Sequence, residues 1–161
     1  SEVSQATPNQ IADVVPSSRQ VLWLYGHEHR LAFYNMTVLP NDVRVLGRCI
    51  GNGGFPSTQA PIPARARESG LIAYDDRLYK LQPGIVFNQN LMFNGFVHMD
   101  LEGPQATFKY STLAIDPTTS ELSQTLQTDL VEEVFQIDND GNVQLTSLLI
   151  LNDGMTVISN H

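Results

Sequence analysis

Several kinds of residue are scarce in this sequence, and each scarcity excludes something. Among its 161 residues there is one cysteine, Cys49, so no disulfide can form within the chain. No apolar run reaches the ~18 residues that a membrane-spanning helix needs. Charged residues make up 16%, and neither a helical nor a coiled-coil period runs through the chain.

Basic residues are also few, because 9 Lys and Arg stand against 17 Asp and Glu, a net charge of −8. An acidic surface repels the phosphates of nucleic acids and of anionic membranes, so we expect neither as a partner. A metal ion can reverse the sign of a local site, so small anionic substrates remain open. With 42% hydrophobic residues, the composition is that of a soluble globular domain whose compartment stays undetermined.

Short apolar runs separated by turn residues fill most of the chain. Residues 1–19 are a polar lead-in segment, in which residues 8–15 could make a short helix. Residues 20–161 form a β-rich domain, with strands predicted at 21–25, 30–38, 43–50, 95–102, 105–115, 130–138, 143–150 and 155–159 and two short strands within 71–81. Gly103-Pro104 and Asp140-Gly141 are predicted to close hairpins. The fold class is therefore mainly β, or α+β, with an antiparallel-rich sheet.

The pattern within these runs also predicts which side chains are buried. The run from Val21 to Tyr25 has no polar side, which is typical of a strand in the interior of a sheet and buried on both faces. Alternation at 43–50 places Cys49 on an apolar face, as a structural thiol, and Arg44 and Arg48 on the opposite face. Asp75 and Asp76 are predicted to be solvated turn residues.

The sharpest local feature is Gly26-His27-Glu28-His29, directly after that apolar strand. Two of the four histidines in the chain stand here, two residues apart, where the edge of a sheet often carries a site. Imidazole suits divalent transition metals, so His27 and His29 are candidate metal ligands. Two imidazoles do not complete a site, and two exposed loop histidines are the simpler alternative.

A second feature is the glycine-rich segment Gly51-Asn52-Gly53-Gly54. Glycines allow a backbone to approach a ligand closely or to turn with positive φ, so this segment is a candidate phosphate-binding loop. It lacks the Lys-Ser/Thr of a nucleotide-binding loop, and a tight turn that leaves a strand is the simpler interpretation.

Taken in order, these features resemble the calcineurin-like metallophosphoesterases. The strand ending in Gly26-His27-Glu28-His29 is similar to the last metal motif of that family. The segment Arg48-Cys49-Ile50-Gly51-x-Gly53-Gly54-x-Pro56 is similar to the loop that follows it in a bacterial subgroup, and the strands at 94–104 resemble that subgroup's closing strands. The similarity covers about residues 20–145.

The resemblance implies the second half of a four-layer α/β/β/α sandwich that hydrolyses phosphate esters with two metal ions, Mn, Fe or Zn. His27 and His29 would each bind one ion, and the backbone of Gly51, Asn52, Gly53 and Gly54 would shape the mouth for the substrate. The ions would carry an attacking hydroxide and neutralise phosphoryl oxygens.

The family's remaining motifs, Asp-x-His, Gly-Asp-x-x-Asp and Gly-Asn-His, are not found, and Asn52 stands where the subgroup has a histidine. We therefore expect that this chain lacks its amino-terminal half, binds metal weakly or not at all, and does not catalyse alone. We expect the missing half or a second copy as partner, the latter as a homo-oligomer. The alternatives are a non-catalytic binding or interaction module and a partial enzyme completed by another chain.

Overall fold

The computed structural model describes residues 6–26, 28–53, 58, 62, 68, 70–80, 90–115 and 125–158. Among them are one α-helix, one 3₁₀ turn and eleven strands, so the mainly-β prediction is confirmed. The bounds are α1 Ala6–Val14, β1 Gln20–Tyr25, β2 Leu31–Val38, η1 Pro40–Asp42, β3 Arg44–Ile50, β4 Leu71–Asp75, β5 Leu78–Lys80, β6 Asn90–Met92, β7 Asn94–Glu102, β8 Gln105–Ile115, β9 Thr125–Ile137, β10 Val143–Ile150 and β11 Met155–Val157. The helix predicted at 8–15 is present as α1, and no described helix is long and apolar enough to cross a membrane.

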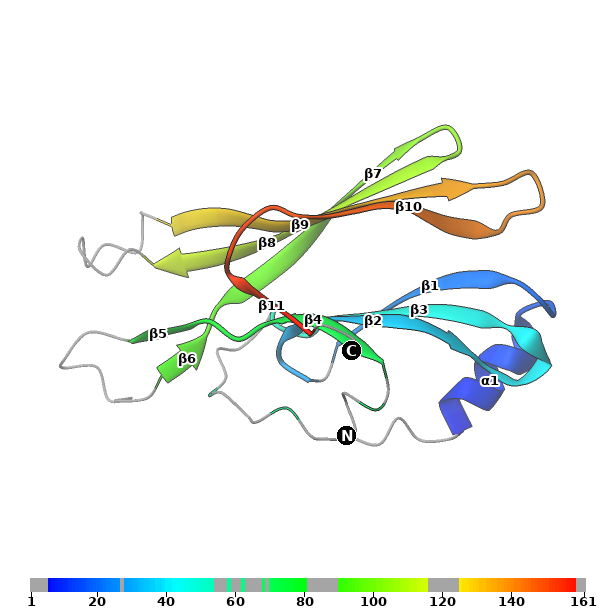
Figure 1. Cartoon of the computed structure of the whole chain (residues 1–161), viewed down its shortest axis with the longest axis horizontal. Coiled ribbons are helices and arrows are strands. Elements are labelled where there is room, and N and C mark those ends of the chain that lie inside the picture. The colour runs from blue at the N-terminus through cyan, green and yellow to red at the C-terminus, as the bar shows by residue number, and fades with distance from the viewer. Residues whose placement is uncertain are drawn as a thin grey trace.

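Two sheets lie face to face and form the body of the molecule (Figure 1). The first sheet has five strands in the order β1-β3-β2-β4-β11, and the second has four in the order β10-β9-β8-β7. A separate pair joins β5 to β6. Helix α1 lies on the side of the first sheet that faces away from the second (Figure 1). The strand pairs are antiparallel except β1 with β3, which is parallel.

Both hairpins predicted from turn residues are present in the second sheet. β7 and β8 pair out to Glu102 and Gln105, with Gly103 at φ 56° in the turn between them. β9 and β10 pair from Ile137 and Val143, with Gly141 at φ 79°. Both glycines adopt the left-handed conformation that other residues avoid, so local sequence dictates these two turns.

The core fills the space between the two sheets. Phe33 of β2 packs against Tyr110 of β8 edge-to-face, with ring centroids 4.8 Å apart, and Phe108 packs in the same way against Phe135 at 5.4 Å. A smaller cluster on the outer face of the first sheet contains Cys49, which is fully buried as predicted. Burial raises the pKa of the Cys49 thiol, so it remains protonated and inert.

Strand β1 differs from its prediction in position and in burial. It is an edge strand, paired among the described strands with β3 alone, and all six of its residues are only partly buried. The prediction that residues 21–25 lie inside a sheet and are buried on both faces is therefore wrong for this chain. An apolar run indicates that both faces of a strand can be buried. It does not show which other elements are present to bury them.

Two charged side chains are buried, and for one of them, Asp75, the prediction of a solvated turn residue is wrong. Asp75, at the end of β4, is 3% exposed and accepts hydrogen bonds from Arg77, from Nε at 2.8 Å and from Nη2 at 3.0 Å. The Arg77 guanidinium also lies over the Phe93 ring and donates to Thr112 Oγ1 at 2.7 Å. Arg48 is likewise fully buried between the sheets. In both cases an ion pair offsets the cost of desolvating the charge.

Candidate functional site

The two motifs singled out in the sequence lie side by side where strands β1 and β3 end. In the candidate site, "edge" means this carboxyl end of the first sheet. β1 and β3 run parallel in register, with Tyr25 beside Cys49, so the segments that follow them leave from the same edge. The Gly51 N–H donates to the Arg30 carbonyl at 3.2 Å, which joins the turn after β3 to the turn after β1. A β-carbon on Gly26 would lie 3.8 Å from the Gly51 Cα, so the smallest side chain at residue 26 would already touch the turn after β3.

The histidine motif is partly described. His27 lies outside the described residues. His29 is exposed at the edge and has φ 37°, in the left-handed region that non-glycine residues seldom adopt. The turn that carries His29 reverses the chain from β1 into β2, which is antiparallel to β3. Ser18, Asn41 and Asp42 also have positive φ, so this conformation marks a tight turn and does not by itself mark a site.

Glu28, between the two histidines, is anchored to the sheet. The Tyr34 hydroxyl donates to Glu28 Oε2 at 3.3 Å, and Arg30 Nε donates to the Glu28 carbonyl at 3.4 Å. Burial, followed by the negative charge of Glu28, raises the pKa of Tyr34 to about 12. Burial and the adjacent Tyr34 also raise the pKa of Tyr25. Both phenols therefore stay protonated at neutral pH, and Tyr34 stays a hydrogen-bond donor to Glu28.

The sequence did not mark Tyr34 as part of this edge, because it is 6 residues beyond Glu28 and lies on β2. The signal that could have identified Tyr34 is alternation within β2. It places Tyr34 on the same face as Ala32, which packs in the cluster with Cys49. Tyr25 and Tyr34 lie on the outer face of the first sheet, with ring centroids 6.4 Å apart. The two rings therefore pack next to the turn that carries Glu28.

The glycine-rich turn is built against the second sheet. Asn52 is 7% exposed, and its carbonyl accepts a hydrogen bond from the Gly95 N–H at 2.9 Å. A β-carbon on Gly95 would lie 2.5 Å from Asn52 Nδ2 and 2.7 Å from the Ser111 carbonyl oxygen, so position 95 has no room for a side chain. Gly51 is partly buried, Gly53 is exposed, and Gly54 lies outside the described residues. Within this turn, Gly53 thus offers accessible backbone, whereas the Asn52 side chain points into the protein.

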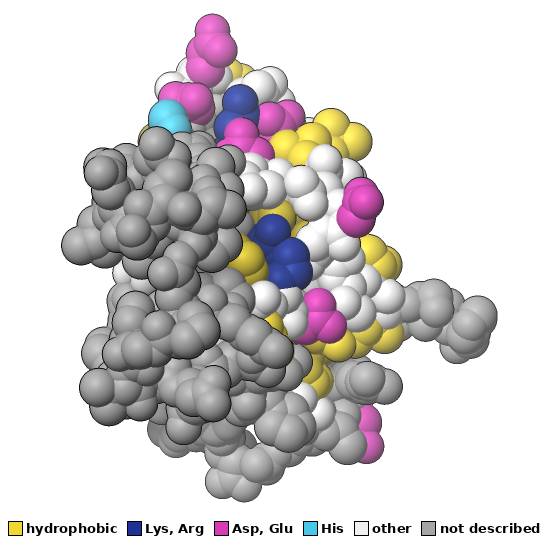
Figure 2. Space-filling view, turned by 90° about the vertical axis from the view of Figure 1, so that its left-hand side faces the viewer, with side chains coloured by type: hydrophobic (Ala, Val, Ile, Leu, Met, Phe, Trp, Pro, Cys, Tyr) yellow, Lys and Arg dark blue, Asp and Glu magenta, His cyan; other side chains and the backbone are white. Residues whose placement is uncertain are grey.

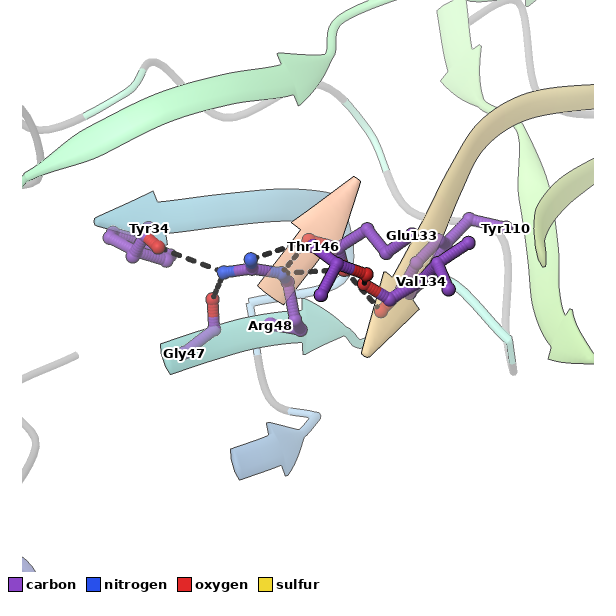
Figure 3. A network of polar contacts seen from close by, with 7 residues as sticks. All are labelled: Tyr34, Gly47, Arg48, Tyr110, Glu133, Val134 and Thr146. Atoms are coloured by element: carbon purple, nitrogen blue, oxygen red, sulfur yellow. Dashed lines mark hydrogen bonds and ion pairs between the residues drawn. The ribbon is translucent and has the colours of Figure 1, made fainter. Parts of the chain in front are cut away.

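A buried ion pair between the two sheets holds together the strands that lead to this edge. The Arg48 Nε donates to both carboxylate oxygens of Glu133, at 3.0 and 2.8 Å, and neither side chain has solvent exposure (Figure 3). Arg48 Nη1 donates to the carbonyls of Tyr34 and Gly47, each at 2.8 Å, and the Tyr110 hydroxyl donates to Glu133 Oε2 at 2.9 Å. Burial, followed by the charge of Glu133, raises the pKa of Tyr110. Arg48 therefore fixes β2, β3 and β9 in one arrangement.

The first sheet also brings arginines to this edge. β2 is antiparallel to both β3 and β4, so β4 runs in the same direction as β1 and β3. Arg30, which is 7% exposed, follows β1, and Arg77, which pairs with Asp75, follows β4, at ends that share one edge. Figure 2 faces this end of the molecule and shows basic side chains near the centre of its described part, with hydrophobic side chains beside them.

The donor atoms at this edge do not add up to a metal site within the described residues. No group of three or more His, Cys, Asp or Glu side chains in that part of the chain could hold a metal ion. His29 is the one imidazole described here, and the Glu28 carboxylate accepts from Tyr34. A structural or catalytic site needs at least three protein ligands, so this donor set does not fit a metal ion by itself.

The fold is thus a two-sheet β structure with a histidine turn and a glycine turn joined at one sheet edge. In comparisons with known proteins, no family model, no curated protein and no solved structure matches this chain significantly.

Proposed function

We propose that this chain is the carboxy-terminal part of a metal-dependent phosphoesterase and that residues beyond the described ones supply the rest of its site. The observation that carries the proposal is the hydrogen bond between the Gly51 N–H and the Arg30 carbonyl. Two segments separated by two strands, and chosen from sequence for different reasons, meet at the edge where the parallel strands β1 and β3 end. Sites of α/β proteins favour this position.

Part of the chemistry at the edge suits a phosphate ester. Gly53 presents accessible backbone, and the turn at His29 is held by the contacts of Glu28. In the complete site His27 and His29 would contribute imidazoles to the metal ions, and Tyr34 would position the turn that carries them. When bound, the ions would supply a hydroxide nucleophile and Lewis-acid stabilisation of phosphoryl oxygens.

On this proposal the chain alone binds metal weakly and has no turnover. Titration of the 161-residue chain with Mn²⁺, followed by paramagnetic broadening of the histidine ring signals in NMR spectra, tests this proposal. We expect millimolar binding that broadens the signals of His27 and His29 and is lost in His27→Ala and His29→Ala. His98→Ala is the matched control, because His98 is an exposed histidine on β7 paired with Asp100 at 3.6 Å.

Two results would overturn the proposal. Broadening centred on His98, or binding that survives both alanine variants, would place metal elsewhere on the chain. Robust metal-dependent hydrolysis of para-nitrophenyl phosphate by the purified chain would show that the site is complete without further residues. Sequencing the coding region upstream of Ser1 adds an independent test, because Asp-x-His and Gly-Asn-His motifs there would supply the expected remaining ligands.

A second candidate is an interaction module without catalysis, favoured by the open edge of β1. The edge strand has no charged residue and pairs, among the described strands, on one side alone. A module of this kind would bind a partner through β1 and leave metal unbound. The absence of any Mn²⁺-dependent change at His27 and His29 would favour this second candidate.

A further inference from the structure

We propose that β1 is a dimerisation edge, at which two copies of this chain pair their β1 strands antiparallel and extend the first sheet across a two-fold axis. The inference rests on strand edges and not on the proposed phosphoesterase function. Open strand edges present unpaired backbone N–H and C=O groups, which readily pair with another strand. Proteins that stay monomeric carry features that prevent such edges from pairing with other chains. The four outer strands of the two sheets differ in whether they carry such a feature.

Three of the four outer strands carry a device that discourages pairing. β7 bears the charged Asp100 and Glu102, and β11 is only three residues long. β10 contains a register shift between Leu145 and Ser147, where the extra residue Thr146 bonds back to β9 through its hydroxyl. Charge, shortness and a bulge are the usual means of blunting an edge.

β1 has none of these devices. Its sequence Gln-Val-Leu-Trp-Leu-Tyr contains no charge and no proline, and it pairs with β3 in an unbroken register of six residues. Its residues are partly buried on both faces, although a strand in a parallel pair usually lies inside a sheet covered on both sides. Among these four outer strands, β1 is therefore the one without such a device.

The hydrogen-bond pattern shows which groups of β1 are available. The Arg44 N–H donates to the Arg19 carbonyl at 2.8 Å, so Arg19 points its backbone toward β3. Alternate residues point the same way, which leaves the N–H and C=O groups of Gln20, Leu22 and Leu24 directed to the open edge. A two-fold axis at Leu22 would pair Leu22 with its own counterpart and Gln20 with Leu24 of the second copy.

A second copy is the occupant that these observations favour. The chain has a net charge of −8, so most of its surface repels a like molecule, but β1 lets two copies meet along a segment without charge. An antiparallel arrangement also sets the end of one strand that carries Arg19 toward the end of the other that carries Glu28. The turns at the carboxyl ends of the two strands would lie on the order of 25 Å apart, so dimerisation would not merge the two candidate sites.

Sedimentation equilibrium between 1 and 200 μM tests the proposal. We expect the mass to rise with concentration from 17.9 kDa toward twice that value. Trp23→Lys should weaken association at least tenfold, because a lysine on an edge strand discourages pairing with another strand. Met99→Lys is the matched control on β7, where the side chain is already 50% exposed, and it should leave association unchanged.

Gln20→Pro is a second variant that leaves the core side chains in place. It removes one N–H that points to the open edge and keeps the pairing with β3, since proline is tolerated at the first residue of an edge strand. Amide hydrogen exchange of the unmodified chain gives an independent readout. The N–H groups of Leu22 and Leu24 should exchange slowly at 200 μM and rapidly at 1 μM.

A monomer at 200 μM with rapid exchange at Leu22 and Leu24 would overturn the proposal. A dimer that persists unchanged in both folded variants, Trp23→Lys and Gln20→Pro, would also overturn it, because association would then use another surface. Neither result bears on metal binding at His29, so the failure of this inference and that of the proposed function remain distinguishable.

Discussion

Arg48 and Glu133 come from opposite sheets and form an ion pair in which neither side chain has any solvent exposure. A buried pair is not by itself a large source of stability, because desolvation offsets much of the attraction. The pair instead fixes geometry. The planar guanidinium of Arg48 donates to both carboxylate oxygens of Glu133 and to two backbone carbonyls, so it holds the two sheets in one relative position. Glu133 Oε2 also accepts a hydrogen bond from the Tyr110 hydroxyl, whose side chain is fully buried.

Glu133→Gln should destabilise the protein by about 3–5 kcal/mol, because it leaves the Arg48 charge buried without a counter-charge. Urea denaturation followed by circular dichroism measures the change. Glu132→Gln is the matched control on the same strand. Glu132 pairs with Lys109 at 3.5 Å on the surface, and its loss should cost less than about 1 kcal/mol. Equal effects of the two substitutions would show that the buried pair has no special role.

The local parts of this fold could be predicted from the sequence. The hairpins at Gly103 and Gly141 depend on residues that adopt positive φ within the turn itself, so a few neighbouring letters suffice. The burial of Cys49 followed from alternation. Arg48 obeys the same alternation, but its partner is 85 residues away, and no local pattern shows that a carboxylate will meet it between the sheets.

The arrangement of the candidate site was harder to predict for the same reason. The sequence marked the histidine turn and the glycine turn separately, and the pairing of β3 with both β1 and β2 brings them together. In the sheet β3 lies between β1 and β2, although β2 comes between β1 and β3 in the sequence. This strand order is a property of the whole sheet and cannot be predicted from the residues of one strand. The apolar run of β1 indicated a strand with two coverable faces, but the position of β1 at an edge depends on which strands are present.

Alkaline pH should destabilise the protein through its buried tyrosines. The folded pKa of Tyr34 is about 12 against 10.0 for a free phenol, and burial also raises the pKa values of Tyr25 and Tyr110. A raised folded pKa means that the unfolded chain loses its proton first, so the stabilisation is complete below pH ~10 and is lost as pH rises toward ~12. For Tyr34 alone the loss is on the order of 2 kcal/mol.

Urea denaturation at pH 8, 10, 11 and 12, with absorbance of the phenolate as a second signal, checks this expectation. Tyr34→Phe should reduce the decline above pH 10. The measurement is made in a Cys49→Ala background, because the pKa of the Cys49 thiol is also raised by burial and would add a decline of the same sign. Stability that stays constant from pH 8 to 12 would contradict the assignment.

Asp138 should stabilise the turn between β9 and β10 at neutral pH. Its Oδ1 accepts from the N–H groups of Asp140 and Asn142 at 2.9 and 2.8 Å, and its Oδ2 accepts from Asn142 Nδ2 at 2.9 Å. The hydrogen bonds from Asn142 hold the pKa of Asp138 below its usual 3.8. A lowered folded pKa means that the stabilisation is present above pH ~4 and is lost as pH falls through the folded value.

Asp138→Ala should therefore lower the melting temperature at pH 7 and have a smaller effect at pH 2. Asp140→Ala is the control, because the Asp140 side chain is exposed at the tip of the same turn. NMR titration of the Asp138 carboxyl carbon gives the pKa directly. A midpoint at or above 3.8 would contradict the assigned hydrogen bonds.

Gly95→Ala should disturb the candidate site from the second sheet. A β-carbon at residue 95 would lie 2.5 Å from Asn52 Nδ2 and 2.7 Å from the Ser111 carbonyl, closer than atoms approach without a shift. The glycine turn must then move away from β7, at a cost of about 1–3 kcal/mol. Gly47→Ala is the control, because its β-carbon would meet its nearest neighbour, Tyr25, at an ordinary 3.6 Å.

The double variant Gly95→Ala with Asn52→Gly separates the two contacts. Removing the Asn52 side chain relieves the nearer contact and leaves the one with the Ser111 backbone, so the double variant should regain part of the lost stability. A coupling energy of at least about 0.5 kcal/mol between the two positions is expected for groups in direct contact. If Gly95→Ala is as mild as Gly47→Ala, or if the two substitutions simply add, then Asn52 does not pack against β7, and the Asn52 side chain would be free to reach the edge where His29 lies.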